Sequence, residues 1–149
     1  MVYLVHHADA VGPDVDPQRP LSPGGRMHAD MLAQRALERG VRPVAIWHSG
    51  KLRARQTAEA FWRTCNPMAE FKATRGLQPS DPPEWTKDLL AGETRDVMLV
   101  GHMPSLPRIF RLLVAGNEDA ELEFPQHGFV ALEPHDHGWR ETWRLDRAL

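Results

Sequence analysis

Three short apolar segments of this sequence each end at a histidine. They are VYLVHH (Val2 to His7), VAIWHS (Val44 to Ser49) and VMLVGH (Val97 to His102). Continuous apolar runs of this length are typical of parallel strands that are buried on both faces. Ligands of a parallel sheet bind beyond the carboxyl ends of its strands. We therefore expect one edge of a sheet to carry His6 or His7 together with His48 and His102.

The residues beside these histidines favour a bound anion. Pro104 and Ser105 follow His102 at the expected start of a helix. A second expected helix begins after Ser49 and carries Arg53 near its start. A helix N-terminus offers unpaired N–H groups and the positive end of the helix dipole. Together these features predict a phosphate site.

The segments between the apolar runs predict the elements that position this site. Ser22 is a suitable N-cap with Pro23 at the first helical position, and the helical pattern stops at Gly40. Further helices are expected over Lys51 to Thr64, from a capping box at Asp81 to Glu84 through Leu90, and from Pro104 to Gly116. Strands are expected over Glu70 to Thr74 and in a hairpin of GFVALEP and WRETWRL joined by HDHG. The pattern predicts an α/β fold, a three-layer α/β/α sandwich whose mainly parallel central sheet has an antiparallel edge hairpin.

Length and composition limit the organisation, the partners and the compartment. A chain of 149 residues suits one domain, residues 1–149. With a formal charge of −2 and a pI near 6.4, we expect neither nucleic acid nor a membrane as a partner. Cys65 is the only cysteine, which excludes an internal disulfide and favours a reducing compartment. Because no signal peptide or membrane-spanning run is evident, we expect a cytoplasmic protein.

Four segments spread along nearly the whole chain carry a family resemblance. They are LVHHADA (Leu4 to Ala10), RPLSPGG (Arg19 to Gly25), SGKLRARQTAEA (Ser49 to Ala60) and VGHMP (Val100 to Pro104). In order, spacing and chain length the set resembles the histidine phosphatase superfamily, which has the phosphoglycerate-mutase-like fold. Within that family it is most similar to the short SixA-type phosphohistidine phosphatases.

The resemblance implies a phosphatase that acts through a phosphohistidine intermediate. His7 would be the nucleophile, Arg53 would bind the phosphoryl oxygens, and His102 would hydrogen-bond those oxygens as charge develops. No metal and no other cofactor is implied. The expected partner is a phosphorylated small molecule or a phosphoprotein, with protein phosphohistidine or a small phosphate ester as the substrate.

The sequence departs from the family directly before the nucleophile. His6-His7-Ala8 stands where the family has Arg-His-Gly. Arginine is always charged, whereas His6 carries charge only when it is protonated. Two interpretations stay open: an enzyme of reduced or pH-dependent activity, and a phosphate- or phosphoprotein-binding module with impaired catalysis. In the enzyme, either His6 or Arg19 would bind phosphate in place of the arginine, although Arg19 is equally well explained as a surface residue.

The general acid and a metal site are also open. Asp81 and Glu84 lie where larger family members carry an acid, but the capping box alone explains both. A substrate with a good leaving group, such as phosphohistidine or an aryl phosphate, needs such an acid less. A histidine-rich metal protein is a weaker hypothesis, because His135 and His137 lack a third defined ligand. His48 lies at a position that the family does not use, which favours a structural role.

Overall fold

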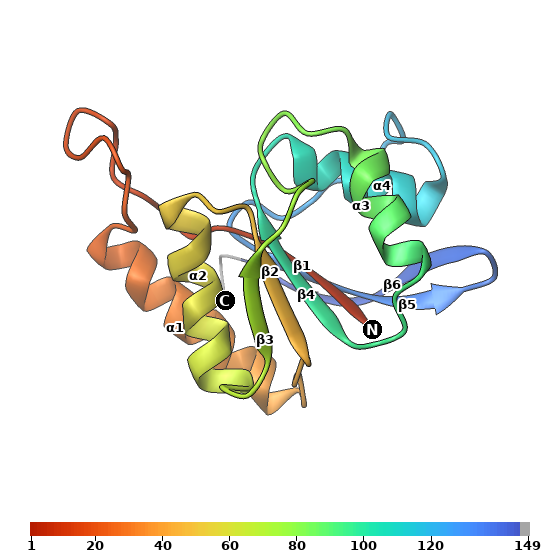
Figure 1. Cartoon of the computed structure of the whole chain (residues 1–149), viewed down its shortest axis with the longest axis horizontal. Coiled ribbons are helices and arrows are strands. Elements are labelled where there is room, and N and C mark those ends of the chain that lie inside the picture. The colour runs from red at the N-terminus through yellow and green to blue at the C-terminus, as the bar shows by residue number, and fades with distance from the viewer. Residues whose placement is uncertain (147–149) are drawn as a thin grey trace.

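The computed structural model describes residues 1–146; the last three residues of the expected domain lie outside this range. Strands and helices alternate along most of the chain (Figure 1). Their order is β1 (Val2–His6), α1 (Pro23–Glu38), β2 (Ala45–His48), α2 (Leu52–Cys65), β3 (Glu70–Ala73), α3 (Pro83–Ala91), β4 (Val97–Gly101), α4 (Ser105–Ala115), β5 (Phe129–His135) and β6 (Gly138–Leu145).

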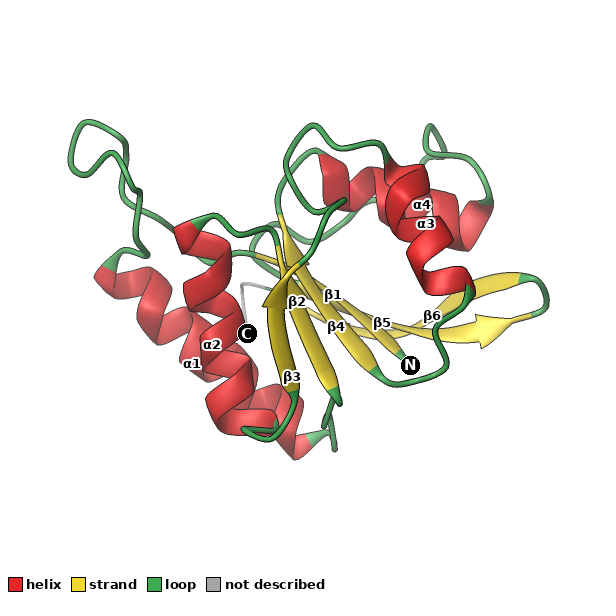
Figure 2. Ribbon diagram, viewed as in Figure 1, coloured by secondary structure: helices red, strands yellow, loops and turns green. Residues whose placement is uncertain are grey.

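The strands form one sheet in the order β3-β2-β4-β1-β5-β6. Strands β1 to β4 are parallel, β5 is antiparallel to β1, and β6 is antiparallel to β5. Helices α1 and α2 cover one face, and α3 and α4 cover the other (Figure 2). The predicted three-layer fold with an antiparallel edge hairpin is therefore confirmed. None of the helices within residues 1–146 has the length and apolar character needed to cross a membrane.

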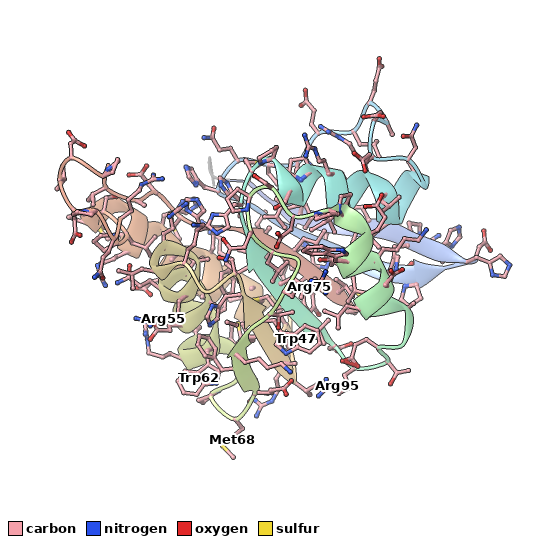
Figure 3. All side chains as sticks on the ribbon, turned by 45° about the horizontal axis from the view of Figure 1, so that its top comes forward. Trp47, Arg55, Trp62, Met68, Arg75 and Arg95 are labelled. Atoms are coloured by element: carbon pink, nitrogen blue, oxygen red, sulfur yellow. The ribbon has the colours of Figure 1, made fainter. Side chains whose placement is uncertain are left out.

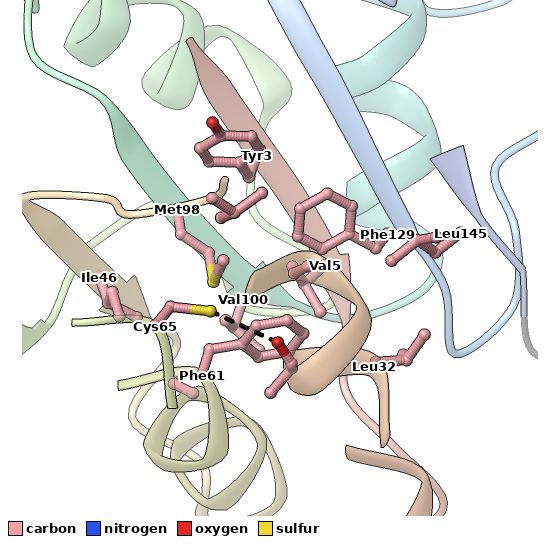
Figure 4. Close-up of a cluster of buried hydrophobic side chains, with 14 of the residues drawn as sticks. Tyr3, Val5, Leu32, Ile46, Phe61, Cys65, Met98, Val100, Phe129 and Leu145 are labelled. Carbon is pink, nitrogen blue, oxygen red and sulfur yellow. Dashed lines mark hydrogen bonds between the residues drawn. The ribbon is translucent and has the colours of Figure 1, made fainter. Parts of the chain in front are cut away.

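Each face of the sheet has its own apolar core. Successive side chains of a strand point to opposite faces, so Val5 of β1 packs on the α1 and α2 side, whereas Leu4 packs on the α3 and α4 side. Figure 4 shows the first of these cores, where Phe61 of α2 and Phe129 of β5 lie together with their ring centroids 5.8 Å apart. Burial on both faces explains why β1, β2 and β4 read as continuous apolar runs.

The predicted start of α1 is confirmed. Ser22 is the N-cap, and its Oγ accepts the main-chain N–H of Gly25 at 3.0 Å. The same hydroxyl donates to the Asp9 carboxylate at 2.8 Å, which ties α1 to the chain that follows β1. A Cβ at Gly25 would lie 2.0 Å from the carbonyl oxygen of Asp9, so only glycine permits this approach.

The predicted capping box of α3 is wrong. The residue at the N-cap is Pro82, and no side chain caps the helix. The Asp81 carboxylate instead accepts the main-chain N–H groups of Gly76 and Gln78, at 3.1 and 3.0 Å. These donors belong to the loop that leads from β3 to α3. Asp81 therefore stabilises this loop, because it satisfies two N–H groups that the tight turn leaves without main-chain partners.

Charged side chains protect the β3 edge of the sheet. The Trp47 indole N–H donates to the Glu70 carboxylate at 3.0 Å. The charged ends of Lys72 and Arg95 lie 5.4 and 6.0 Å from the centre of the Trp47 ring, and Figure 3 shows Trp47 and Arg95 on this side of the molecule. Charges along an edge strand disfavour pairing with another chain.

Candidate functional site

His7 and His102 lie side by side because two parallel strands end together. In the pairing of β1 with β4, His6 lies opposite Gly101, and the main-chain N–H of His7 donates to the Gly101 carbonyl at 3.1 Å. The histidines that follow these strands therefore leave the sheet at the same edge. Their ring centroids are 5.0 Å apart, and the two residues are 8% and 2% exposed.

A main-chain hydrogen bond fixes the tautomer of His7. Its Nδ1 lies 2.6 Å from the carbonyl oxygen of Ala8, which can only accept, so Nδ1 carries the ring proton. Nε2 keeps its lone pair and has no protein hydrogen-bond partner within residues 1–146. Burial lowers the pKa of His7 to about 4, and the charge of Arg53 also lowers it. His7 is thus a neutral imidazole with one free lone pair.

Ser49 orients His102. The Ser49 Oγ lies 2.7 Å from His102 Nε2, and it also accepts the main-chain N–H of Lys51 at 3.2 Å. The hydroxyl proton can donate to Nε2, and in that arrangement the ring proton of His102 lies on Nδ1. Nδ1 is buried and has no protein partner. Burial, followed by the charge of His7, lowers the pKa of His102 to about 3. His102 thus presents a buried N–H donor that the protein does not satisfy.

The first turns of α2 bring Arg53 to the same place. Thr57 joins this helix to the chain after His7, because its Oγ1 accepts the main-chain N–H of Ala8 at 3.0 Å and donates to the carbonyl of Arg53 at 2.9 Å. The Nε of Arg53 is buried and lacks a protein partner. The charge of Arg53 lowers the pKa values of His6, His7 and His102.

His127 completes the group, although it lies outside the sequence motifs. Its ring stacks on His6 with the centroids 4.6 Å apart and the planes 5° from parallel. The main-chain N–H of His127 donates to His6 Nδ1 at 2.7 Å. Because that N–H can only donate, His6 must carry its ring proton on Nε2. Burial, followed by the charges of His7 and His127, lowers the pKa of His6 to about 2. His6 is therefore a neutral hydrogen-bond donor.

The charges that act on these imidazoles are positive. Besides Arg53 and the neighbouring rings, the charges of Arg19 and Lys51 lower the pKa of His102, and Arg19 also lowers that of His7. Arg19 lies in the loop between β1 and α1, where its Nε donates to the carbonyl of Val11 at 3.0 Å. None of the largest contributions to these two pKa shifts comes from a carboxylate among residues 1–146. The site is therefore suited to an anion.

Neither candidate acid forms a hydrogen bond or ion pair with His7 in the described part of the chain. Asp81 holds the loop before α3 with two main-chain hydrogen bonds. Glu84 is exposed on α3. Neither carboxylate is among the largest contributions to the pKa shifts of His6, His7 and His102.

The structure does not bring His48, His135 or His137 into the group. His48 Nδ1 accepts the main-chain N–H of Gly50 at 3.0 Å, and its ring packs on Phe71 of β3 at 5.0 Å. His48 thus has a local structural role. At the end of β5, His135 lies 3.5 Å from the Asp136 carboxylate and is exposed, as is His137 in the turn that follows.

The cluster of imidazoles is better suited to an anion than to a metal. One ring nitrogen from each of His6, His7 and His127 lies within 4.8 Å of the other two. The Nδ1 lone pair of His6 already accepts the His127 N–H, and its Nε2 carries the proton, so this ring has no lone pair for a metal. Two imidazoles remain, which is fewer than the three protein ligands of a typical catalytic zinc site.

Comparison with known proteins identifies the family and the fold of this chain. Residues 3–88 match the histidine phosphatase superfamily (branch 1). The protein histidine phosphatase SixA in complex with tungstate has a similar structure, with a TM-score of 0.85, 19% identity, and coverage of 99% of this chain and 97% of that one. The SixA protein of Agrobacterium tumefaciens gives a TM-score of 0.78 at 28% identity, covering 97% and 96% of the two chains.

More distant structures share the same fold. Phosphoserine phosphatase of Entamoeba histolytica, in complex with 3-phosphoglyceric acid, gives a TM-score of 0.72 at 13% identity, covering 97% of this chain and 96% of that one. No sequence among the curated proteins matches the chain. Because the family match covers more than half of the sequence and includes His7 and Arg53, this chain belongs to the histidine phosphatase superfamily (branch 1).

Proposed function

We propose that this protein is a metal-independent phosphatase that acts through a phosphohistidine intermediate. The observation that carries the proposal is the placement of a free lone pair on His7 beside buried donors of Arg53 and His102 that lack protein partners. A nucleophile and unsatisfied donors around one point suit a phosphoryl group, whose oxygens accept hydrogen bonds.

Each group has a defined part in the reaction. The Nε2 of His7 attacks phosphorus, so that a P–N bond forms while the bond to the leaving group breaks. Arg53 and the Nδ1–H of His102 hydrogen-bond the phosphoryl oxygens, over which the negative charge is spread. Water then attacks the phosphohistidine, which releases phosphate and restores neutral His7. The hydrogen bond to the Ala8 carbonyl holds the His7 ring in one orientation through both steps.

His6 supplies a hydrogen bond where the family has an arginine. Its Nε2–H is a neutral donor, and neutral hydrogen bonds are about half as strong as those of charged groups. We therefore expect slower turnover than the arginine would give, with a loss on the order of 10²- to 10³-fold. Arg19 adds positive charge to the site from its own loop, where its side chain is bound to Val11.

The proposed substrates are protein phosphohistidine and small phosphate esters. Two structures with similar folds are named SixA, and one of them is a protein histidine phosphatase. Another is a phosphoserine phosphatase, so this fold also serves phosphate monoesters. The cationic surroundings of His7 suit the dianionic phosphate that both kinds of substrate carry.

Turnover of p-nitrophenyl phosphate between pH 5 and 8 tests the proposal. We expect the unaltered protein to release p-nitrophenol with or without EDTA, and the His7→Ala variant to release none. His135→Ala changes an exposed histidine at the end of β5 and serves as the matched control, with unchanged activity. Turnover that survives His7→Ala would refute the phosphohistidine mechanism, and turnover lost to EDTA would refute metal independence.

A second candidate function is a phosphate- or phosphoprotein-binding module. The observation that favours it is the replacement of the family's arginine by His6, which is neutral in the folded protein. This function predicts that tungstate or inorganic phosphate binds in calorimetry while no phosphate ester is hydrolysed at any pH tested. Weakened binding in the Arg53→Ala variant would place the bound anion at the site described.

A further inference from the structure

We propose that His127 is the general acid and base of this site. Its Nε2 would protonate the leaving group in the first step and take a proton from water in the second. The inference rests on the proposed function, since it requires His7 as the nucleophile. It extends the substrates to monoesters with poor leaving groups, such as phenyl and alkyl phosphates, which need an acid to leave.

The hydrogen bonds of His127 leave the correct nitrogen free. Its Nδ1 lies 2.6 Å from the carbonyl oxygen of His7, which can only accept, so Nδ1 carries a proton and donates it. Nε2 has no protein hydrogen-bond partner within residues 1–146. A ring that is held through Nδ1 and free at Nε2 can gain or lose a proton at Nε2 without changing its orientation.

The position of the ring suits proton transfer to a group bound at His7. The His7 and His127 rings have centroids 5.8 Å apart with their planes at 61°, and one ring nitrogen of each lies within 4.8 Å of the other. No hydrogen bond joins the two rings. Both rings are therefore open to a group bound at His7. A phosphoryl group on His7 lies beside the His127 ring, and in the proposed first step the leaving oxygen, in line with His7 Nε2 and phosphorus, lies at His127 Nε2.

The backbone around His127 is built to hold the ring in this place. His127 has a φ of 53°, which is uncommon for a residue other than glycine. The next residue closes a tight turn, since a Cβ at Gly128 would lie 2.5 Å from the Pro125 Cβ. The Gly128 carbonyl accepts the main-chain N–H of His6 at 3.0 Å, so the turn is bonded directly to the end of β1. A strained residue persists only where its surroundings fix it, and such residues cluster at active sites.

Four other candidates, Asp81, Glu84, His6 and His102, fit the role less well. Asp81 is committed to its loop and Glu84 is exposed. The Nδ1 lone pair of His6 accepts the main-chain N–H of His127, so the only ring proton of His6 is on Nε2. Loss of that proton would leave an anionic ring. His102 is bonded through Nε2 to Ser49 and directs Nδ1 as a donor. Among these groups His127 alone combines a fixed ring with a free nitrogen close to His7.

The proposed steps balance. In the first, His7 Nε2 forms a bond to phosphorus as the P–O bond breaks, and the proton on His127 Nε2 passes to the leaving oxygen to give an alcohol or phenol. In the second, water attacks phosphorus, its proton passes to His127 Nε2, and the P–N bond of His7 breaks. The sum is an ester and water giving an alcohol and phosphate, and both histidines return to their starting state.

The test compares two substrates that differ in their need for an acid. The value of kcat/KM reports the first step for 2,4-dinitrophenyl phosphate, whose leaving group needs no proton, and for phenyl phosphate, whose leaving group does. We expect His127→Asn to lower kcat/KM for phenyl phosphate on the order of 10²- to 10⁴-fold and to change that for dinitrophenyl phosphate by less than about threefold. Asparagine is chosen because it tolerates a positive φ. His135→Asn is the matched control and should alter neither value.

Each outcome decides a separate point. If His127→Asn lowers kcat/KM for both substrates equally, or for neither, His127 is not the acid, even though the proposed phosphatase function stands. If the unaltered protein hydrolyses neither substrate, the proposed function itself fails. If the His127→Asn variant does not fold, the test is kcat/KM of the unaltered protein for a series of aryl phosphates. A steep fall of kcat/KM as the phenol becomes less acidic would overturn the proposal, and a shallow one would support it.

Discussion

Lowering the pH from 7 to 5 should destabilise the folded protein through the histidines of the site. Burial, with smaller contributions from neighbouring charges, lowers the pKa values of His6, His7 and His102 to about 2, 4 and 3. The reference value for a solvated histidine is 6.5. Below pH 6.5 the unfolded chain therefore binds protons that the folded protein does not bind, so the free energy of unfolding falls as the pH falls.

The magnitude follows from this difference in proton binding. The stabilisation is complete above pH 6.5 and is lost progressively toward pH 4 for His7, and toward lower pH for the other two. Between pH 7 and 5, a histidine that protonates only in the unfolded chain costs about 2 kcal/mol. Three such histidines cost about 6 kcal/mol, which is a large part of a typical folding free energy of about 5–15 kcal/mol.

Urea unfolding at pH 7, 6 and 5 measures this loss. The His6→Asn variant removes one of the three groups while its Oδ1 can still accept the His127 N–H, so the loss should shrink by about 2 kcal/mol. His135→Asn, at the exposed end of β5, should leave the loss unchanged. Stability that stays constant from pH 7 to 5 would refute the reasoning. In that case the folded protein would bind these protons, and His6 would act as a cation like the arginine it replaces.

Three further predictions test how the site is held together. Thr57→Val removes the hydroxyl that accepts the Ala8 N–H, so it should lower the free energy of unfolding by about 1–3 kcal/mol. Thr57→Ser, which keeps the hydroxyl, should cost less, and equal costs in chemical denaturation would contradict the role of the hydrogen bond. Gly25→Ala would place a Cβ 2.0 Å from the Asp9 carbonyl and should cost about 1–3 kcal/mol or more. Gly24→Ala, where a Cβ meets no atom within 4 Å, should be neutral or stabilising, so the order of the two melting temperatures is the check. Dialysis against EDTA should leave the melting temperature unchanged, because two available imidazoles are too few for a tight metal site, and a fall would contradict that count.

Local patterns in the sequence were sufficient for the fold and for part of the site. Apolar runs such as Val97 to His102 predict buried parallel strands because burial on both faces selects the same residue types along the whole strand. Ser22 and Gly116 mark helix ends through the hydrogen bonds and backbone angles that such ends require. The carboxyl ends of parallel strands meet at one edge of a sheet. The prediction that His7 and His102 lie at the same edge therefore required only that each follows a parallel strand.

Other features depend on contacts between distant parts of the chain. The ring proton of His6 is fixed by the main-chain N–H of His127, 121 residues away, and nothing local to either residue records that bond. The capping box at Asp81 was a sound local reading, but two N–H groups of the preceding loop compete for the same carboxylate. The sequence by itself determined which residue types reach the edge of the sheet. Only the tertiary structure decided their protonation and partners, because these depend on which groups the fold buries together.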